Sequence, residues 1–237
     1  MARFLTPHRR RGVEYLDQSD DAALQRRSHR DIALANSLFG GTRAAFAELE
    51  AMLPRGGGEV TLLDVGTGTG DIPERLVRLA ARAGVTLRVV GLDGRIELVK
   101  ATREWPTPGI CGDALALPFA SASFDCVLAS QVVHHFTRVE ALHLLREMHR
   151  VAKRRVIVSD LRRSWTAAAG LWLVSFPLGF HPVSRHDGVV SILRGFDGPD
   201  LAALISDAVG VRPRIRHRFA WRVTASWEPA AATGPLH

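Results

Sequence analysis

Short apolar runs alternate with amphipathic stretches through the middle of the chain. Five apolar runs predict buried strands: residues 60–65, 86–92, a short stretch near Ile110, 124–129 and 156–158. Apolar residues at helical spacing predict three intervening helices: 72–82, 94–104 and 138–152. Because strands and helices alternate along the chain, the pattern predicts an α/β fold with a mostly parallel, doubly wound sheet.

The two ends of the chain follow a different pattern. Residues 1–20 look like a loose basic arm, and helical spacing over 21–53, broken at Gly40-Gly41, predicts two helices that form a cap. Near the other end, one surface helix, two closing strands and a disordered tail are expected: 201–209, 211–218, 221–227 and 229–237. We therefore divide the chain into an arm with a helical cap, 1–55, and a main domain, 56–237.

Residues 164–198 interrupt the alternation and form an insert before the closing strands. Trp165 to Phe176 is almost wholly apolar, but its twelve residues are too few to span a bilayer. This stretch predicts a buried or cavity-lining helix, with contact to a membrane surface as the alternative. A polar loop is expected at Arg185-His186-Asp187-Gly188.

The sequence LLDVGTGTGDI at 62–72 combines a strand, a tight turn and the start of a helix. Its glycines allow positive φ and a close approach to a ligand, and the free N–H groups at the helix start favour electron-rich groups. A dinucleotide fingerprint would need glycine at position 71, where this chain has Asp. Acidic residues here would repel a pyrophosphate, so the turn predicts a nucleoside whose tail is positively charged and free of phosphate. Asp64 and Asp71 are placed to meet such a charge.

Polar residues stand at the ends of five predicted strands: Asp64, Asp93, Asp113, Ser130 and Asp160. The carboxyl ends of parallel strands meet at one edge of a sheet, where ligands of such folds bind. We therefore expect these five side chains to surround one site.

Composition narrows the class of protein. With 46% hydrophobic and 23% charged residues, the chain is typical of a globular protein. A net charge of +7 would suit nucleic-acid binding, but the arginines are scattered and lack interleaved aromatic residues, so that partner is disfavoured. The basic start has no apolar run after it, so we expect no secretory signal and a cytoplasmic location. Cys111 and Cys126 are isolated, and buried reduced thiols are expected.

Four stretches together resemble class I S-adenosylmethionine-dependent methyltransferases, most closely the small-molecule group of ubiquinone and menaquinone biosynthesis. They are LLDVGTGTGD (62–71), VVGLD (89–93), CGDALALPFASASFDCVLAS (111–130) and VVHHF (132–136). The helix DIALANSLFGG (31–41) is also similar to one in quinone methyltransferases, without its usual tyrosine. The resemblance covers about residues 60–230 and implies a Rossmann-like seven-stranded sheet.

The resemblance also implies the cofactor, S-adenosylmethionine, and the product, S-adenosylhomocysteine. Eleven positions match the family's cofactor site: Asp64, Gly66, Thr67, Gly68, Gly70, Asp93, Gly94, Asp113, Ala114, Ser130 and Gln131. The glycine turn would wrap the methionine part and the ribose, with Asp64 under the amino group. Asp93, 23 residues beyond Gly70, would accept both ribose hydroxyls. Asp113 would bind the adenine amino group, and Ser130 would lie beneath the sulfonium.

Histidines near the expected methyl position are candidates for a general base. His134 and His135 follow the strand at 124–129, and His186 lies in the insert, which this family uses for the acceptor. For His134 and His135, a packed hydrogen-bonded pair is the alternative. The candidate substrate-binding residues are His135, Trp172, His181, Arg185 and Asp187.

These observations favour metal-independent methylation of a small lipophilic or aromatic acceptor that is phenolic, quinone-like or polyketide-derived. Oxygen is favoured over carbon as the methylated atom. An RNA or protein methyltransferase and a non-catalytic binding module remain as alternatives. The sequence leaves open whether the protein is a monomer or a homodimer.

Overall fold

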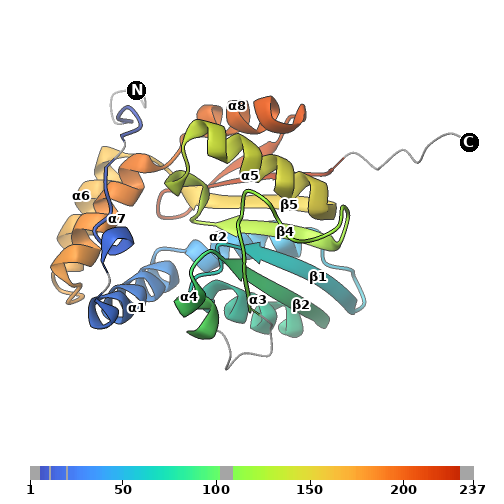
Figure 1. The fold of residues 1–237 in the computed structure, drawn as a ribbon, viewed down its shortest axis with the longest axis horizontal. Helices are drawn as coiled ribbons and strands as arrows, with labels where there is room; N and C mark the ends of the chain where they lie inside the picture. The colour runs from blue at the N-terminus through green and yellow to red at the C-terminus, as the bar shows by residue number, and fades with distance from the viewer. Residues whose placement is uncertain (1–5, 11, 20, 102–108, 230–237) are drawn as a thin grey trace, which may run out of the picture.

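A seven-stranded sheet forms the centre of the structure, a computed structural model that describes residues 6–10, 12–19, 21–101 and 109–229 (Figure 1). The strands are β1 (Gly58–Val65), β2 (Val85–Asp93), β3 (Gly109–Cys111), β4 (Phe124–Ser130), β5 (Ala152–Leu161), β6 (Arg214–Arg218) and β7 (Arg222–Trp227). Their order is β3-β2-β1-β4-β5-β7-β6, and β7 runs antiparallel to both neighbours. The predicted doubly wound sheet is confirmed.

The central strands are buried on both faces, which explains their continuous apolar runs. Leu62 and Leu63 of β1 and Val127 of β4 have no exposed surface. The strand order reverses at β1, because β2 lies on one side of it and β4 on the other. Such a reversal opens a crevice at the carboxyl ends of the strands, where ligands of this architecture bind.

Helices cover both faces of the sheet (Figure 1). One face carries α5 (Arg138–Val151) and α8 (Gly198–Val209), whose apolar residues join the larger hydrophobic cluster. The other carries α2 (Gly41–Glu50) and α3 (Asp71–Arg82), and α4 (Ile96–Ala101) packs beside β2 and β3. The end of the helix predicted at 94–104, residues 102–104, and all but the first residue of the disordered tail predicted at 229–237 lie outside the described residues.

A second group of helices stands beyond the carboxyl ends of the strands (Figure 1). It consists of η2 (Leu16–Gln18), α1 (Ala22–Leu38), α6 (Trp165–Ser175) and α7 (Pro182–Arg194). Helices α6 and α7 pack through a small apolar cluster that includes Ala168 and Ile192. The short helix η4 (Val133–His135) follows β4 and contacts α7. These elements close the crevice left by the sheet.

The polar loop predicted at 185–188 is wrong, because these residues lie within α7. His181 caps this helix by accepting the N–H of Val183, and Pro182 occupies its first position, where proline is favoured. Asp187 then falls on the buried side of the helix and Gly188 on the side of the cavity. Tertiary packing thus overrides the low helix propensity of the polar residues and glycine.

The described part of the N-terminal arm is docked, in contrast to the predicted loose arm. The Asp187 carboxylate accepts the backbone N–H groups of Tyr15 and Leu16, each at 2.9 Å. Glu14 and Leu16 are both buried.

The prediction that both cysteines are buried is right for Cys126 and wrong for Cys111, which is exposed at the sheet edge.

Candidate active site

A cavity of about 720 Å³ lies at the carboxyl ends of β1, β2 and β4. Its floor comes from the loops after these strands, and its walls come from η4, α1, α6 and α7. This volume lies within the range of small-molecule and cofactor pockets. The strand reversal and the cavity therefore coincide, as the sequence predicts.

The glycine turn after β1 bends sharply beneath the cavity. Gly66, Gly68 and Gly70 all have positive φ, at 72°, 59° and 78°. The N–H groups of Gly66 and Thr67 donate to the carbonyl oxygen of Leu92 at 2.7 and 3.0 Å, which ties the turn to β2. The predicted strand, turn and helix start are confirmed, with Gly70 as the residue before α3.

We expect Gly66→Ala to destabilise the protein more than Gly68→Ala, although both residues have positive φ. A Cβ at position 66 would lie 2.3 Å from Val132 Cγ2, whereas a Cβ at 68 would meet no atom within 4 Å. Backbone strain costs about 1–2 kcal/mol at either position, and the clash adds about 1–3 kcal/mol at 66 alone. Thermal and urea unfolding of both variants measures the difference. Equal losses of stability would contradict the clash.

Asp93 holds the turn and the next loop at the same time. Its Oδ2 accepts the N–H of Gly68 at 2.9 Å, and its Oδ1 accepts the N–H of Arg95 at 3.0 Å. The carboxylate is thereby fixed at the end of β2, facing the cavity. One residue joins the two loops that form the cavity floor.

Asp64 at the end of β1 is a buried acid whose carboxyl group is only partly hydrogen-bonded. It is fully buried, and its Oδ1 has no hydrogen-bond partner within the described chain. Burial raises the pKa of Asp64 to about 7; a hydrogen bond from Thr67 opposes this rise, and the nearby Asp71 and Asp93 add to it. Burial also raises the pKa of Asp71, against a hydrogen bond from Asn36. Two acids at the glycine turn thus favour a cationic ligand.

A chain of side chains links the cap helix α1 to β7 across the cavity floor. Asn36 donates to Asp71 Oδ2 at 3.3 Å and accepts from the amide of Gln131, which in turn accepts from Arg222 at 2.6 Å. Burial lowers the pKa of Arg222 to about 10, and the nearby Asp160 opposes this shift. Sequence reasoning assigned Arg222 no role, since it lies 91 residues from Gln131.

His134 in η4 and Asp160 at the end of β5 form a buried pair. His134 Nδ1 lies 2.6 Å from Asp160 Oδ1, and its backbone N–H donates to Asp160 Oδ2 at 3.1 Å. Burial would raise the pKa of Asp160, but the charge and hydrogen bond of His134 outweigh burial and lower it. The other ring nitrogen, Nε2, is buried on the cavity wall without a hydrogen-bond partner in the described chain. His134 is therefore oriented by a carboxylate and forms part of the cavity wall.

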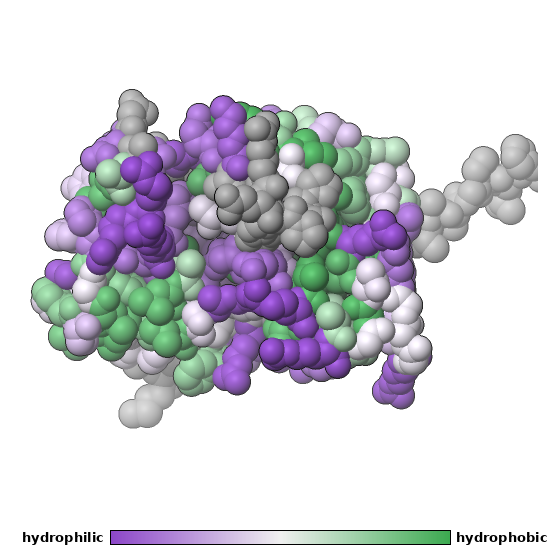
Figure 2. Space-filling view, turned by 90° about the horizontal axis from the view of Figure 1, so that it is seen from below, coloured by the Kyte–Doolittle hydropathy of each residue, from purple (hydrophilic) through white to green (hydrophobic). Residues whose placement is uncertain are grey.

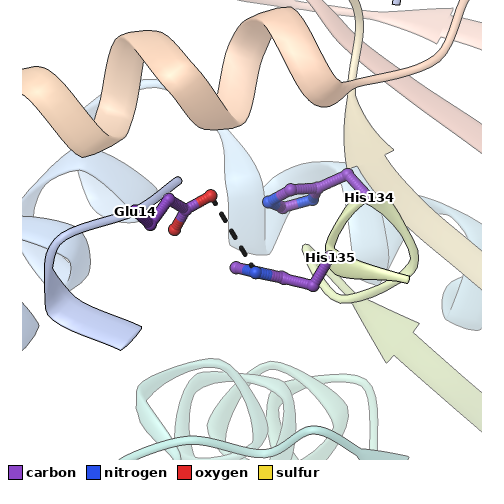
Figure 3. Close-up of side chains that lie close together, drawn as sticks. All are labelled: Glu14, His134 and His135. Carbon is purple, nitrogen blue, oxygen red and sulfur yellow. Dashed lines mark ion pairs between the residues drawn. The ribbon is translucent and has the colours of Figure 1, made fainter. Parts of the chain in front are cut away.

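Glu14 and His135 lie beside this pair (Figure 3). Glu14 on the arm and both histidines of η4 point towards one another, and ligand-type atoms of the three lie within 4.8 Å of one another. Glu14 Oε1 is 3.9 Å from His135 Nδ1, and it accepts hydrogen bonds from Ser191 at 2.8 Å and Arg194 at 2.9 Å. Sequence reasoning missed Glu14 because it is more than a hundred residues from both histidines.

The structure brings most of the predicted site together. All predicted cofactor residues except Gly70 line the cavity: Asp64, Gly66, Thr67, Gly68, Asp93, Gly94, Asp113, Ala114, Ser130 and Gln131. His134 and His135 line it as well. The cofactor half of the prediction and these two histidines therefore converge on one space.

The remaining predicted residues lie outside the cavity wall. Trp172 points outwards from α6, His181 caps α7, and Arg185 stacks on Phe176 with its guanidinium carbon 3.6 Å from the ring centre. His186 pairs with Asp187, whose carboxylate also holds the arm. Apolar residues of the same two helices line the cavity instead: Ala167, Gly170, Leu171, Val174, Gly188 and Ile192.

Comparison with known proteins agrees with this geometry. Residues 63–159 match the family described as "Methyltransferase domain". The bifunctional biotin biosynthesis protein BioHC of Cellvibrio japonicus is 31% identical over 143 residues, 56% of this chain and 28% of that protein. The demethylmenaquinone methyltransferase of Roseiflexus sp. is 39% identical over 95 residues, 38% of this chain and 37% of that protein. These alignments thus span about a third of the relatives' lengths.

A solved structure extends the likeness to nearly the whole chain. The crystal structure of an S-adenosylmethionine-dependent methyltransferase from Aquifex aeolicus superposes with a TM-score of 0.59 at 17% identity, covering 93% of this chain and all of that one. Residues 63–159 thus resemble a methyltransferase domain, and the fold is similar to that of S-adenosylmethionine-dependent methyltransferases. The similarity to quinone biosynthesis methyltransferases agrees with the sequence motifs.

The residues present fit the family's cofactor, S-adenosylmethionine. The unpartnered, buried Asp64 suits a positive group, and the glycine turn leaves open space where a Cβ at Gly68 would stand.

No helix in the described part of the chain is long and apolar enough to cross a membrane.

Proposed function

We propose that this protein methylates the hydroxyl group of a small acceptor with a phenolic head and an apolar body. The observation that carries the proposal is His134, which lines the cavity: its Nδ1 is held by Asp160, and its buried Nε2 has no partner in the described chain. A carboxylate that fixes the tautomer of a histidine prepares the opposite ring nitrogen to accept a proton.

Four groups of residues would hold the cofactor, which supplies an electrophilic methyl group on a sulfonium when bound. Asp64 and Asp71 would attract the positive charges of its amino acid part, and Asp93 would accept the ribose hydroxyls. Asp113 and its neighbours would bind the adenine. Ser130 and Gln131, which follow β4, would lie beneath the sulfonium.

Cofactor affinity should rise about tenfold between pH 6 and pH 8. Asp64 has a pKa of about 7 in the free protein, so it is largely protonated at pH 6 and largely ionised at pH 8. Because a cationic ligand binds the ionised carboxylate, affinity increases through this range and then levels off. Calorimetric titration across the range measures the slope, and Asp64→Asn should flatten it. A slope that persists in Asp64→Asn would assign the titration to another group.

His134 would take the proton of the acceptor hydroxyl as the oxygen attacks the methyl carbon. The new oxygen–carbon bond forms while the methyl–sulfur bond breaks, and the proton ends on His134 Nε2. Asp160 would stabilise the resulting imidazolium. General-base assistance of this kind contributes about 10²- to 10⁴-fold in rate. Orientation of the acceptor and exclusion of water by the bound molecules would supply the rest.

Glu14 and His135 would bind the acceptor's polar head rather than a metal ion. Two histidines and a carboxylate are a ligand set for divalent cations. The guanidinium of Arg194, however, already lies 2.9 Å from Glu14 Oε1 and supplies the positive charge that this carboxylate needs.

The acceptor's body would be lipophilic or aromatic because the rest of the cavity wall is apolar. Leu171 and Val174 of α6, Ile192 of α7 and Phe136 after η4 face this space. Apolar walls around a few convergent polar groups are typical of small-molecule sites. A quinone-like or polyketide-derived phenol has this division into a polar head and an apolar body.

The proposal is tested by incubating the protein with methyl-labelled S-adenosylmethionine and a series of phenols, hydroquinones and alkylresorcinols. Label in an organic-extractable methyl ether is the expected result, and mass spectrometry of the product distinguishes oxygen from carbon. Bulk RNA and a protein mixture run beside the phenols. Label in either macromolecule, or cofactor binding without turnover on any acceptor, would contradict the proposal.

A further inference from the structure

We propose that α6 and the turn after it dock on an anionic lipid surface. Four large apolar side chains of this segment are exposed and lie outside the cavity wall: Trp165, Trp172, Leu173 and Phe176. We call these four residues the α6 patch. Leu173 is the most open, with 61% of its surface exposed.

The α6 patch is left over after the helix has made its internal contacts. The opposite side of α6 packs on α7 through Ala167 and Ala168. A helix that is apolar around its circumference is normally covered on all sides, and a contiguous exposed apolar area marks a binding surface. Figure 2 shows hydrophobic residues gathered at the end of the molecule that holds α1 and α6, at the left of the view.

Arginines among these apolar residues indicate an anionic partner. The guanidinium carbon of Arg10 lies 5.0 Å from the ring centre of Trp165, and that of Arg185 lies 3.6 Å from that of Phe176. Arg27 of α1 donates to the carbonyl oxygen of Gly179 in the turn after α6. These contacts place cationic groups around the patch.

Asp31 forms an ion pair with Arg27 at 3.5 Å, which leaves Arg10 and Arg185 as the cations stacked on the patch. Asp31 and Asp187 are buried and accept backbone N–H groups, that of His181 for Asp31 and those of Tyr15 and Leu16 for Asp187. The exposed rings of Trp165 and Phe176 are thus in contact with cationic groups, whereas both of these carboxylates are buried. Tryptophan and arginine are typical of surfaces that bind the headgroup region of anionic membranes.

Helix α6 is suited to lie on a membrane rather than to cross it. Its eleven residues are about half the length that a spanning helix needs. The side of α6 that faces the protein lines the cavity through Ala167, Gly170 and Leu171. A lipophilic acceptor dissolved in the membrane would therefore reach the site past α6. This last step rests on the proposed function, whereas lipid binding does not.

The test compares binding of the whole protein to phosphatidylcholine vesicles with and without phosphatidylglycerol. We expect sedimentation with the anionic vesicles only, weakened by salt. The double variant Leu173→Glu/Phe176→Glu should lose about tenfold or more in vesicle affinity. Val139→Glu replaces an apolar side chain of α5 that is 65% exposed and lies outside the patch, and it should bind as the wild type does.

Three results would overturn the proposal. The first is a wild-type protein that binds neither vesicle, and the second is equal loss of binding in the double variant and Val139→Glu. The third is a wild-type dimer in solution that the double variant turns into a monomer, which would assign the patch to a second copy of this chain. Turnover of a water-soluble phenol is measured in the same preparations, because it tests methyl transfer separately from lipid binding. Vesicle binding by a protein without turnover would refute only the proposed function.

Discussion

Asp93→Ala should weaken cofactor binding by about 100-fold. The Asp93 carboxylate holds Gly68 and Arg95 in place and is the group expected to accept the ribose hydroxyls. Loss of two hydrogen bonds to a charged acceptor costs about 3 kcal/mol, which is about 100-fold in affinity. Calorimetry with S-adenosylmethionine and S-adenosylhomocysteine measures the effect directly.

The matched control for Asp93→Ala is Asp207→Ala. Asp207 is an acid on α8 that is 54% exposed and pairs with Arg138, far from the cavity in sequence and outside its wall. Its replacement should leave cofactor affinity and melting temperature nearly unchanged. Wild-type affinity in a folded Asp93→Ala protein would show that the cofactor site has been misplaced.

His134→Ala should lower kcat by about 10²- to 10⁴-fold while leaving cofactor affinity within about twofold of the wild type. The side chain lines the cavity and is fixed by Asp160. Its removal takes away the proton acceptor but none of the groups assigned to the cofactor. Steady-state kinetics with saturating acceptor, together with calorimetry of the cofactor, separates the two effects.

Two companion variants make the result for His134 specific. His143→Ala removes an exposed histidine of α5 and should leave kcat unchanged. Asp160→Asn keeps the shape of the partner but removes its charge, so kcat should fall and its dependence on pH should shift. The substitution also leaves the buried Arg222 without its nearby negative charge, and a lower melting temperature is expected. A His134→Ala protein with bound cofactor and undiminished kcat would refute the role of general base.

That the residues proposed to hold the cofactor lie together could be predicted, because their signals are local. Gly66, Gly68 and Gly70 stand within five residues, and Asp93 ends a strand that the apolar pattern identifies by itself. The carboxyl ends of parallel strands must meet at one edge, so the order of strands and helices is enough to bring these residues together. Where the chain repeats a strand, turn and helix, its local pattern and its fold agree.

Apart from His134 and His135, the side chains proposed to meet the acceptor could not be predicted, because they come from distant parts of the chain. Glu14 meets Ser191 across 177 residues, and Tyr15 meets Asp187 across 172. The outer residues chosen from the insert, Trp172 and Arg185, have the right chemistry but lie on the wrong side of their helices. Which side of a helix faces the site depends on its rotation against its neighbours, and no short-range pattern contains that information.

The amino-acid sequence by itself thus determined the sheet, the glycine turn and the acids around it, because backbone geometry and burial impose them on adjacent residues. Only the tertiary structure decided that Asp160 orients His134, that the N-terminal arm docks Glu14 beside it, and that α6 keeps one apolar face in the cavity and another exposed. These contacts depend on the packing of whole elements against one another, where burial of apolar surface and pairing of buried charges outweigh local preference.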